Sequence, residues 1–285
     1  MSTPLNTHES WTSWIESGHG AESSDTAMPM LPAIAGDVMG LAMDAAVSIA
    51  RIARVIAKDQ VLATRVLRLA NSAYCAPMQA ITTVNDAIVR MGTGPVRNAV
   101  LAVCFTSHLQ GANVYGTQGR DLMDHAIGTA YLARLLAERL GTDLEEAFMC
   151  GLLHDIGKLL LLKLSRDFIK HGVPTPSAQE IESAYSARHS EMGALLMRHW
   201  KLPEALVEPV QFHHDPDSAP THTREATITY AANRLSHRYG FGCPTDDANL
   251  LEDEIAVRAG LTESMLGDLD RRAPGLFQVA RQIVA

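Results

Sequence analysis

Apolar residues recur at helical spacing along most of the chain. Between residues 31 and 109 they return every three or four positions, as at Val66, Leu67 and Ala70. Turn residues such as Asn71 and Gly92 separate the runs. The pattern predicts an all-α protein, a helical bundle with short connections and no sheet.

One apolar stretch carries ionisable residues in its middle. Residues 148–164 are almost all apolar, yet His154, Asp155 and Lys158 fall inside them. A buried carboxylate is costly to keep charged, so this pair of His and Asp needs a metal ion, another histidine or a backbone cap as a partner. The stretch is therefore the predicted centre of any chemistry.

Local signals indicate how this centre is positioned. Thr142 is the predicted N-cap of a central helix, Glu145 completes a capping box, and Gly141 ends the helix before it. Gly157 loosens the backbone behind the His–Asp pair. We therefore expect both side chains at a helix end, pointing into one cavity, and His125 on the inward face of the preceding helix.

Composition and charge narrow the class of protein. The chain has 285 residues, 47% of them hydrophobic and only 5% aromatic, and a formal net charge of −8. An acidic balance argues against nucleic acid as a partner. Basic residues at near-helical spacing are better explained as a solvated helix face; they are Arg51, Arg54, Lys58, Arg65 and Arg68.

Cysteine usage and the N-terminus bear on the compartment. The 4 cysteines form no CxxC pair, which predicts neither a disulfide framework nor a thiolate zinc site. The sequence shows no secretory signal and no apolar run long enough to cross a bilayer. We expect a cytoplasmic protein that does not partner a membrane.

The motifs around the centre resemble a known superfamily. HDIGK, with His125 one helix earlier, is similar to the HD superfamily of metal-dependent phosphohydrolases. The segments IARVIAKDQVLATRVLRLANSAYCAP and ITTVNDAIVRMGTGPVRNAVLA strongly resemble the HDOD family, the HD-related output domains of bacterial signalling proteins. The resemblance runs from about residue 31 to about residue 236.

This resemblance and the local composition predict the domain organisation. Residues 1–27 are a polar leader, and residues 28–240 are an HDOD domain. A connection rich in Gly, Asn and Gln divides that domain into an N-terminal helical lobe, residues 28–115, and an HD-like lobe, residues 116–240. Helices in residues 241–285 are expected to pack on the HD-like lobe.

The resemblance also implies a set of metal ligands, which are His125, His154, Asp155, His189, His213 and His214. So many imidazoles suit a divalent transition metal such as iron, zinc or manganese better than magnesium. The other histidines in this half of the chain are predicted to lie on the surface; they are His171, His199, His222 and His237.

Two features depart from the catalytic families. Asn233 stands where those families place the last aspartate ligand, so one full negative charge toward a cation is missing. The sequence DPDSAP follows His214, in place of the GYP-type segment of the cyclic-dinucleotide phosphodiesterases.

Two hypotheses for function follow. The preferred one is a non-catalytic signal-transduction and regulatory output module with a degenerate HD-type metal site, acting on a signalling protein partner. The alternative is a metal-dependent phosphohydrolase or phosphodiesterase acting on a nucleotide or cyclic dinucleotide. Its metal ions would activate water, and Asp155 and Lys158 would be catalytic, with Lys158 steadying the phosphate. A nucleotide is therefore a candidate ligand.

Overall fold

The computed structural model describes residues 48–71, 79–96, 98–100, 102, 116–170, 177–246 and 248–284. Within these ranges every regular element is helical and none is a strand, which confirms the predicted fold class. The predicted leader at residues 1–27 lies outside the described residues, as does most of the Gly, Asn and Gln-rich connection.

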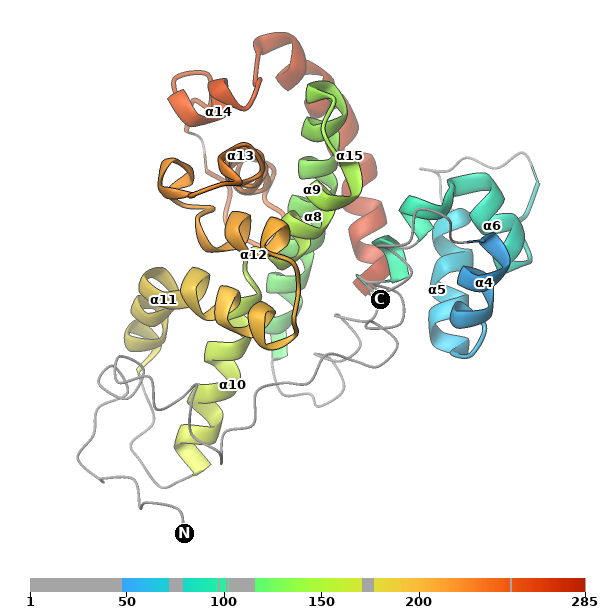
Figure 1. Cartoon of the computed structure of the whole chain (residues 1–285), viewed down its shortest axis with the longest axis horizontal. Coiled ribbons are helices and arrows are strands. Elements are labelled where there is room, and N and C mark those ends of the chain that lie inside the picture. The colour runs from blue at the N-terminus through green and yellow to red at the C-terminus, as the bar shows by residue number, and fades with distance from the viewer. Residues whose placement is uncertain are drawn as a thin grey trace.

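The N-terminal helices form a small group of their own (Figure 1). They are α4 (Ile49–Ile56), α5 (Gln60–Ala70) and α6 (Val84–Met91), followed by helical residues 93–96 and 98–100. Their shared core contains Ile56, Val66 and Ile88. The Asn71 side chain ties the end of α5 to the next segment, since its amide donates to the carbonyls of Leu67 and Ile81, each at 2.8 Å.

Helices α8 (Gly116–Leu140) and α9 (Leu144–Leu153) pack against each other at the centre of the molecule. Their close approach depends on Gly151, because a Cβ atom there would lie 2.7 Å from the Cα atom of Ala130.

The prediction of Thr142 as the N-cap of α9 is wrong by one residue. Asp143 is the cap, and its Oδ1 accepts from the amides of Glu145 and Glu146 at 2.9 Å.

Thr142 serves the preceding helix instead. Its amide donates to the carbonyl of Ala137 at 3.0 Å, after Gly141 has turned into the left-handed region at φ 64°. This is how a helix ending on glycine satisfies its last carbonyls. A threonine engaged in that way leaves the next polar residue, Asp143, to begin α9.

Four helices and a short 3-10 turn follow α9 along the chain (Figure 1). They are α10 (Ile156–Lys170), α11 (Ala178–His199), α12 (Glu204–Gln211), the 3-10 turn η1 (Pro216–Ser218) and α13 (Thr223–Tyr239). Helix α10 packs on α11, and α13 packs across both α8 and α9. Pro209 lies inside α12, a helix of 8 residues.

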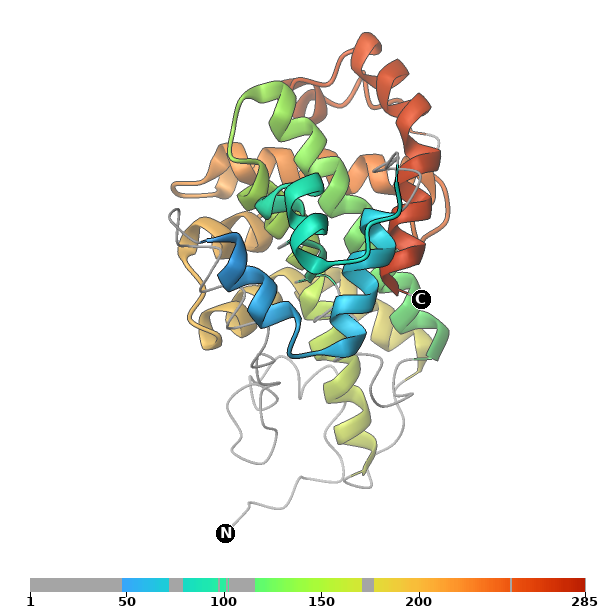
Figure 2. The ribbon, with the colours of Figure 1, turned by 90° about the vertical axis from the view of Figure 1, so that its right-hand side faces the viewer.

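Two C-terminal helices complete the chain. Helix α14 (Glu254–Arg258) packs on α13, and α15 (Glu263–Val284) runs along α8. Helix α15 also contacts α5, so it touches both the N-terminal helices and the central pair (Figures 1 and 2). Among the described helices, none is both long enough and apolar enough to cross a membrane.

Candidate metal centre

The His–Asp pair lies at a break between two helices. Helix α9 ends at Leu153 and α10 begins at Ile156, so His154 and Asp155 occupy the junction, as the sequence predicted. Both are buried, with exposed fractions of 0% and 4%.

The role of Gly157 differs from the one expected. A Cβ atom there would collide with the carbonyl oxygen of His189, so this glycine lets α10 approach α11 closely.

The structure brings all six predicted ligand residues together from different helices. His125 comes from α8 and His189 from α11, and His213 and His214 follow the end of α12. His125, His189 and His213 are buried, whereas His214 lies at the exposed edge of the group. Residues far apart in sequence therefore meet around Asp155.

The first group of donor atoms comprises His125, His154 and Asp155. The Nε2 atoms of the two histidines are 3.2 Å apart. Oδ2 of Asp155 lies 3.7 Å from Nε2 of His125 and 3.5 Å from Nε2 of His154. Lys158 also reaches this oxygen, with its ammonium nitrogen at 2.7 Å.

The second group comprises His189, His213 and His214. Nε2 of His189 is 3.3 Å from Nε2 of His213 and 3.1 Å from Nε2 of His214. The other oxygen of Asp155, Oδ1, lies 3.3 Å from Nε2 of His189 and 3.9 Å from Nε2 of His213. Asp155 therefore lies between the two groups and offers one oxygen to each.

Backbone carbonyls fix which ring nitrogen carries the proton. Nδ1 of His154 faces the carbonyl of Gly151 at 2.7 Å, and Nδ1 of His213 faces that of Val210 at 2.6 Å. The partners are Phe241 for His125, at 3.1 Å, and Tyr185 for His189. A carbonyl can only accept, so each Nδ1 donates and each neutral ring presents an unprotonated Nε2.

Burial keeps these rings neutral. It lowers the pKa of His125 to about 4 and that of His154 to about 3, and it lowers the pKa of His213 well below its ordinary value. For Asp155, burial alone would raise the pKa, but the surrounding imidazoles and Lys158 outweigh it and the net shift is downward.

These residues fit a transition-metal ion. Unprotonated Nε2 atoms facing one another at 3.2 and 3.3 Å cannot hydrogen-bond, so their lone pairs repel unless a cation lies between them. Imidazoles that donate from the other nitrogen to a backbone carbonyl are arranged as metal ligands usually are. Oδ1 of Asp155 is buried and accepts no hydrogen bond from the described residues, which leaves it available to the same ion.

Asn233 lies beside the first group. It projects from α13, is 6% exposed, and places its Oδ1 3.0 Å from Nε2 of His125. Two acceptor atoms face each other there, which again requires a cation between them or a rotation of the amide. The amide therefore lies against a candidate ligand and carries no charge of its own.

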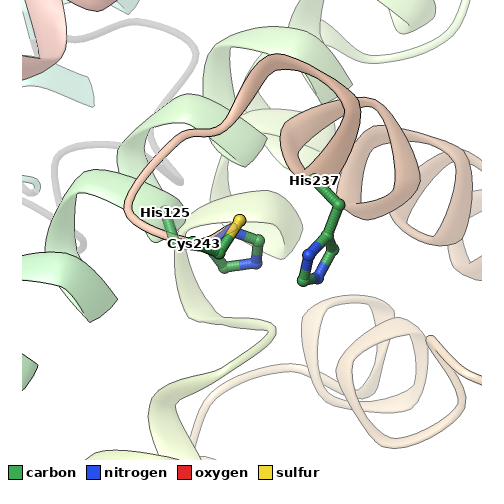
Figure 3. A group of neighbouring side chains, drawn as sticks. All are labelled: His125, His237 and Cys243. Atoms are coloured by element: carbon green, nitrogen blue, oxygen red, sulfur yellow. The ribbon is translucent and has the colours of Figure 1, made fainter. Parts of the chain in front are cut away.

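Sequence reasoning missed two residues beside the centre. His237, predicted to be at the surface, has its ring 4.9 Å from that of His125, and Sγ of Cys243 lies 3.6 Å from Nδ1 of His125. Figure 3 shows these side chains gathered around one space, His237 from α13 and Cys243 from the loop after it. The prediction for His237 is wrong because it lies one helical turn after Asn233 and shares its inward face.

Cys243 had no signal in its own sequence context. Gly242 before it has φ 59°, and a Cβ atom there would collide with the carbonyl oxygen of Asp121. The loop can therefore press on α8 and bring Cys243 to His125. Of the other histidines predicted at the surface, His199 is exposed, His222 is half-buried, and His171 lies outside the described residues.

The described helices thus bring buried histidines together around an aspartate at the junction of α9 and α10. The HDOD domain family matches residues 28–216, and the chain belongs to that family.

Relatives and solved structures are consistent with this assignment. A Treponema pallidum (strain Nichols) protein described as uncharacterized is 26% identical over 222 residues, which are 74% of this chain and 42% of that protein. Ribonuclease Y of Thermus thermophilus is 34% identical over 118 residues, 41% of this chain and 17% of that enzyme. The chain thus spans less than half the length of these curated relatives.

Two crystal structures share the fold. A Shewanella amazonensis SB2B protein titled "Putative phosphohydrolase" is 23% identical with a TM-score of 0.67, over 98% of this chain and 100% of that one. A Marinobacter aquaeolei VT8 protein titled "Putative signal transduction protein" is 20% identical with a TM-score of 0.71, over 100% of this chain and 68% of that one. At these identities the likeness establishes the fold.

Proposed function

We propose that this protein is a regulatory signal-transduction module whose HD centre binds one transition-metal ion and does not hydrolyse a phosphodiester. The observation that carries the proposal is Asn233, a neutral amide placed 3.0 Å from Nε2 of His125, where a catalytic centre of this class would place a carboxylate. The output of the module is a contact with a signalling protein partner.

The charge balance of the centre supports a single ion. Among the described donors of the two groups, Asp155 is the one carboxylate, and it already faces the ammonium of Lys158 at 2.7 Å. Two divalent cations would place four positive charges around that carboxylate in a buried site. Such charges repel strongly where water is excluded. One ion held by imidazoles and one oxygen of Asp155 avoids this repulsion.

Family membership and one structural neighbour point the same way. The chain carries the HDOD domain, and the Marinobacter aquaeolei structure of the same fold is titled as a signal transduction protein. Asp155 and its partners join α8, α9, α10 and α11. A metal ion at this centre would hold these helices in one arrangement, which suits a regulatory domain.

The test combines metal analysis with a search for turnover. Protein purified without chelator is expected to contain one iron, zinc or manganese ion per chain, and His154→Ala to contain little. His199→Ala is the matched control, because His199 is exposed and outside the centre. Cyclic dinucleotides, nucleotides and a generic phosphodiester should not be hydrolysed with manganese or iron supplied. Turnover that disappears in both His154→Ala and Asp155→Ala, with circular dichroism unchanged, would refute the proposal.

A second candidate function is metal-dependent phosphodiester hydrolysis. The convergence of five imidazoles, together with Lys158 beside Asp155, favours it, because metal-activated water and a nearby cation are what phosphoryl chemistry requires. Some relatives are named ribonuclease Y, and one Shewanella amazonensis structure carries a phosphohydrolase title. The turnover measurements above decide between the two functions.

A further inference from the structure

A second polar site lies away from the histidine centre. A cavity of about 290 Å³ opens between the N-terminal helices and α8. Leu69, Met91 and Pro95 form its apolar wall, and Arg90, Asn98, Tyr131 and Arg134 also line it. None of the lining residues belongs to the predicted metal set.

Asn98 is the unusual member of this site. Its exposed fraction is 1%, and neither Oδ1 nor Nδ2 has a hydrogen-bond partner in the part of the chain that the structure describes. Burying an amide without partners is costly, because both its donor and its acceptor lose their water. A buried polar group left unsatisfied in this way is explained when a bound ligand completes its hydrogen bonds.

The same cavity is lined by the guanidinium group of Arg134. Nε of Arg134 is buried without a hydrogen bond to any described residue, and its nearest carboxylate oxygen there, Oε1 of Glu145, is 3.9 Å away. The Glu145 side chain packs against Gly94, where an added Cβ atom would lie 2.6 Å from its Cδ atom. Arg90 also lines the cavity, and guanidinium groups of this kind favour an anion as the ligand.

The buried amide of Asn98 and the guanidinium group of Arg134 together indicate a class of ligand. An asparagine amide offers one donor and one acceptor side by side, which matches the edge of a purine base, and arginine matches a phosphate. Pockets for small molecules begin at about 300 Å³, so this cavity suits a mononucleotide better than a cyclic dinucleotide. We propose that the cavity binds a purine mononucleotide, with Asn98 on the base and Arg134 on the phosphate.

This ligand would be an effector of the regulatory module. The cavity is lined by α5, α6, α8 and the helical residues 93–96 and 98–100, and α8 also carries His125 of the metal centre. A nucleotide held there joins the N-terminal helices to the helix on which the centre is built. The binding step itself does not depend on the proposed function, because it uses neither the metal nor a partner protein.

The experiment measures binding to the full chain by calorimetry. AMP and GMP are expected to bind saturably, and UMP, adenosine and inorganic phosphate at least tenfold more weakly. Asn98→Leu should weaken AMP binding at least tenfold while the melting temperature stays level or rises, because it removes an unsatisfied buried amide. Arg134→Gln should weaken AMP but leave the weak binding of adenosine unchanged. Arg139→Gln is the matched control, since it lies on the same helix with its side chain 60% exposed.

Several results would overturn this assignment. They are no saturable binding of either purine nucleotide, equal affinity for AMP and inorganic phosphate, or full affinity retained in both Asn98→Leu and Arg134→Gln. If Asn98→Leu fails to fold, Arg134→Gln decides alone. Metal content measured on the same samples separates this result from the proposed function, because losing the metal should leave AMP binding in place.

Discussion

Nε2 of His125 and Nε2 of His154 lie 3.2 Å apart, although each ring donates from Nδ1 to a backbone carbonyl. Two unprotonated nitrogens at this distance repel, and the fold nonetheless holds them there by fixing both rings. The backbone of α9 and the loop after α13 supply those carbonyls. The packing of the helices therefore produces the geometry that we propose to hold a metal ion.

Acid should destabilise the metal-free protein at pH values above those at which carboxylates usually become protonated. His125 and His154 have pKa values of about 4 and about 3 when folded, against 6.5 when unfolded. The unfolded chain thus binds more protons below pH 6.5, and the free energy of unfolding falls as pH drops from 6.5 toward 4. Each ring contributes a loss of about 2 kcal/mol by pH 5. Urea unfolding with chelator between pH 5 and pH 8 measures it.

Two substitutions sharpen this pH measurement. His154→Gln removes one of the buried rings whose pKa is lowered by burial and should reduce the pH dependence, whatever its effect on absolute stability. His199→Gln alters an exposed histidine and should leave the curve unchanged. The same free energy of unfolding at pH 5 and pH 7 in the parent protein would contradict the assignment of neutral buried rings.

Close packing between α10 and α11 should make Gly157 intolerant of a side chain. Gly157→Ala would drive a methyl group into the backbone at His189, and we expect a loss of about 3 kcal/mol of stability. Gly275→Ala is the control, because no described atom lies within 4 Å of its added Cβ atom and it is inside α15. That change should stabilise by about 0.5–1 kcal/mol. Thermal unfolding of both variants tests the pair, and equal melting temperatures would show that the helices can separate without cost.

The outcome at Gly157 illustrates what the sequence could and could not predict. The helical spacing of apolar residues and the HDIGK motif were enough to predict the fold class and to place His154 and Asp155 at a helix junction. The sequence could not show that α11 presses its backbone on Gly157, because that contact joins residues 32 positions apart in the chain. For that glycine, a pattern read locally predicts flexibility where the structure has close packing.

The same limit explains the other differences. His237 and Cys243 reach the centre through a turn at Gly242 and the inward face of α13, and neither residue forms a recognisable motif. Asn98 was visible only as part of a family segment, and its unsatisfied amide appears once the surrounding described helices are in place. Thr142 and Asp143 are both good caps, and the choice between them depends on how α8 ends.

Cys243 should be a slow nucleophile despite its place beside the centre. Burial raises the pKa of its thiol from 9.0 to about 11. At pH 8 the folded protein therefore holds about 100-fold less thiolate at this position than an ordinary cysteine does. Alkylation with iodoacetamide, followed by mass mapping of the Cys243 peptide, should be correspondingly slow and should speed up as pH rises toward 11. The protein unfolded in urea is the reference, and equal rates in the folded and unfolded states at pH 8 would be inconsistent with a buried thiol.

Asn233→Asp should tighten metal binding before it confers any activity. Oδ1 of Asn233 already lies 3.0 Å from Nε2 of His125, so an aspartate of the same shape would add a negative charge next to the position proposed for the ion. We expect at least about a tenfold gain in affinity for manganese or iron, because a carboxylate supplies a negative charge that a neutral amide lacks. Competition with a chelator of known affinity measures the gain. Asn233→Ala, which removes the amide and adds no charge, should bind metal no more tightly than the parent.

Hydrolysis need not follow in Asn233→Asp, because a phosphodiester must also be held in line with the attacking water, and the segment after His214 differs from that of the catalytic families. If Asn233→Asp binds metal no better than the parent, the amide is not the element that weakens this centre.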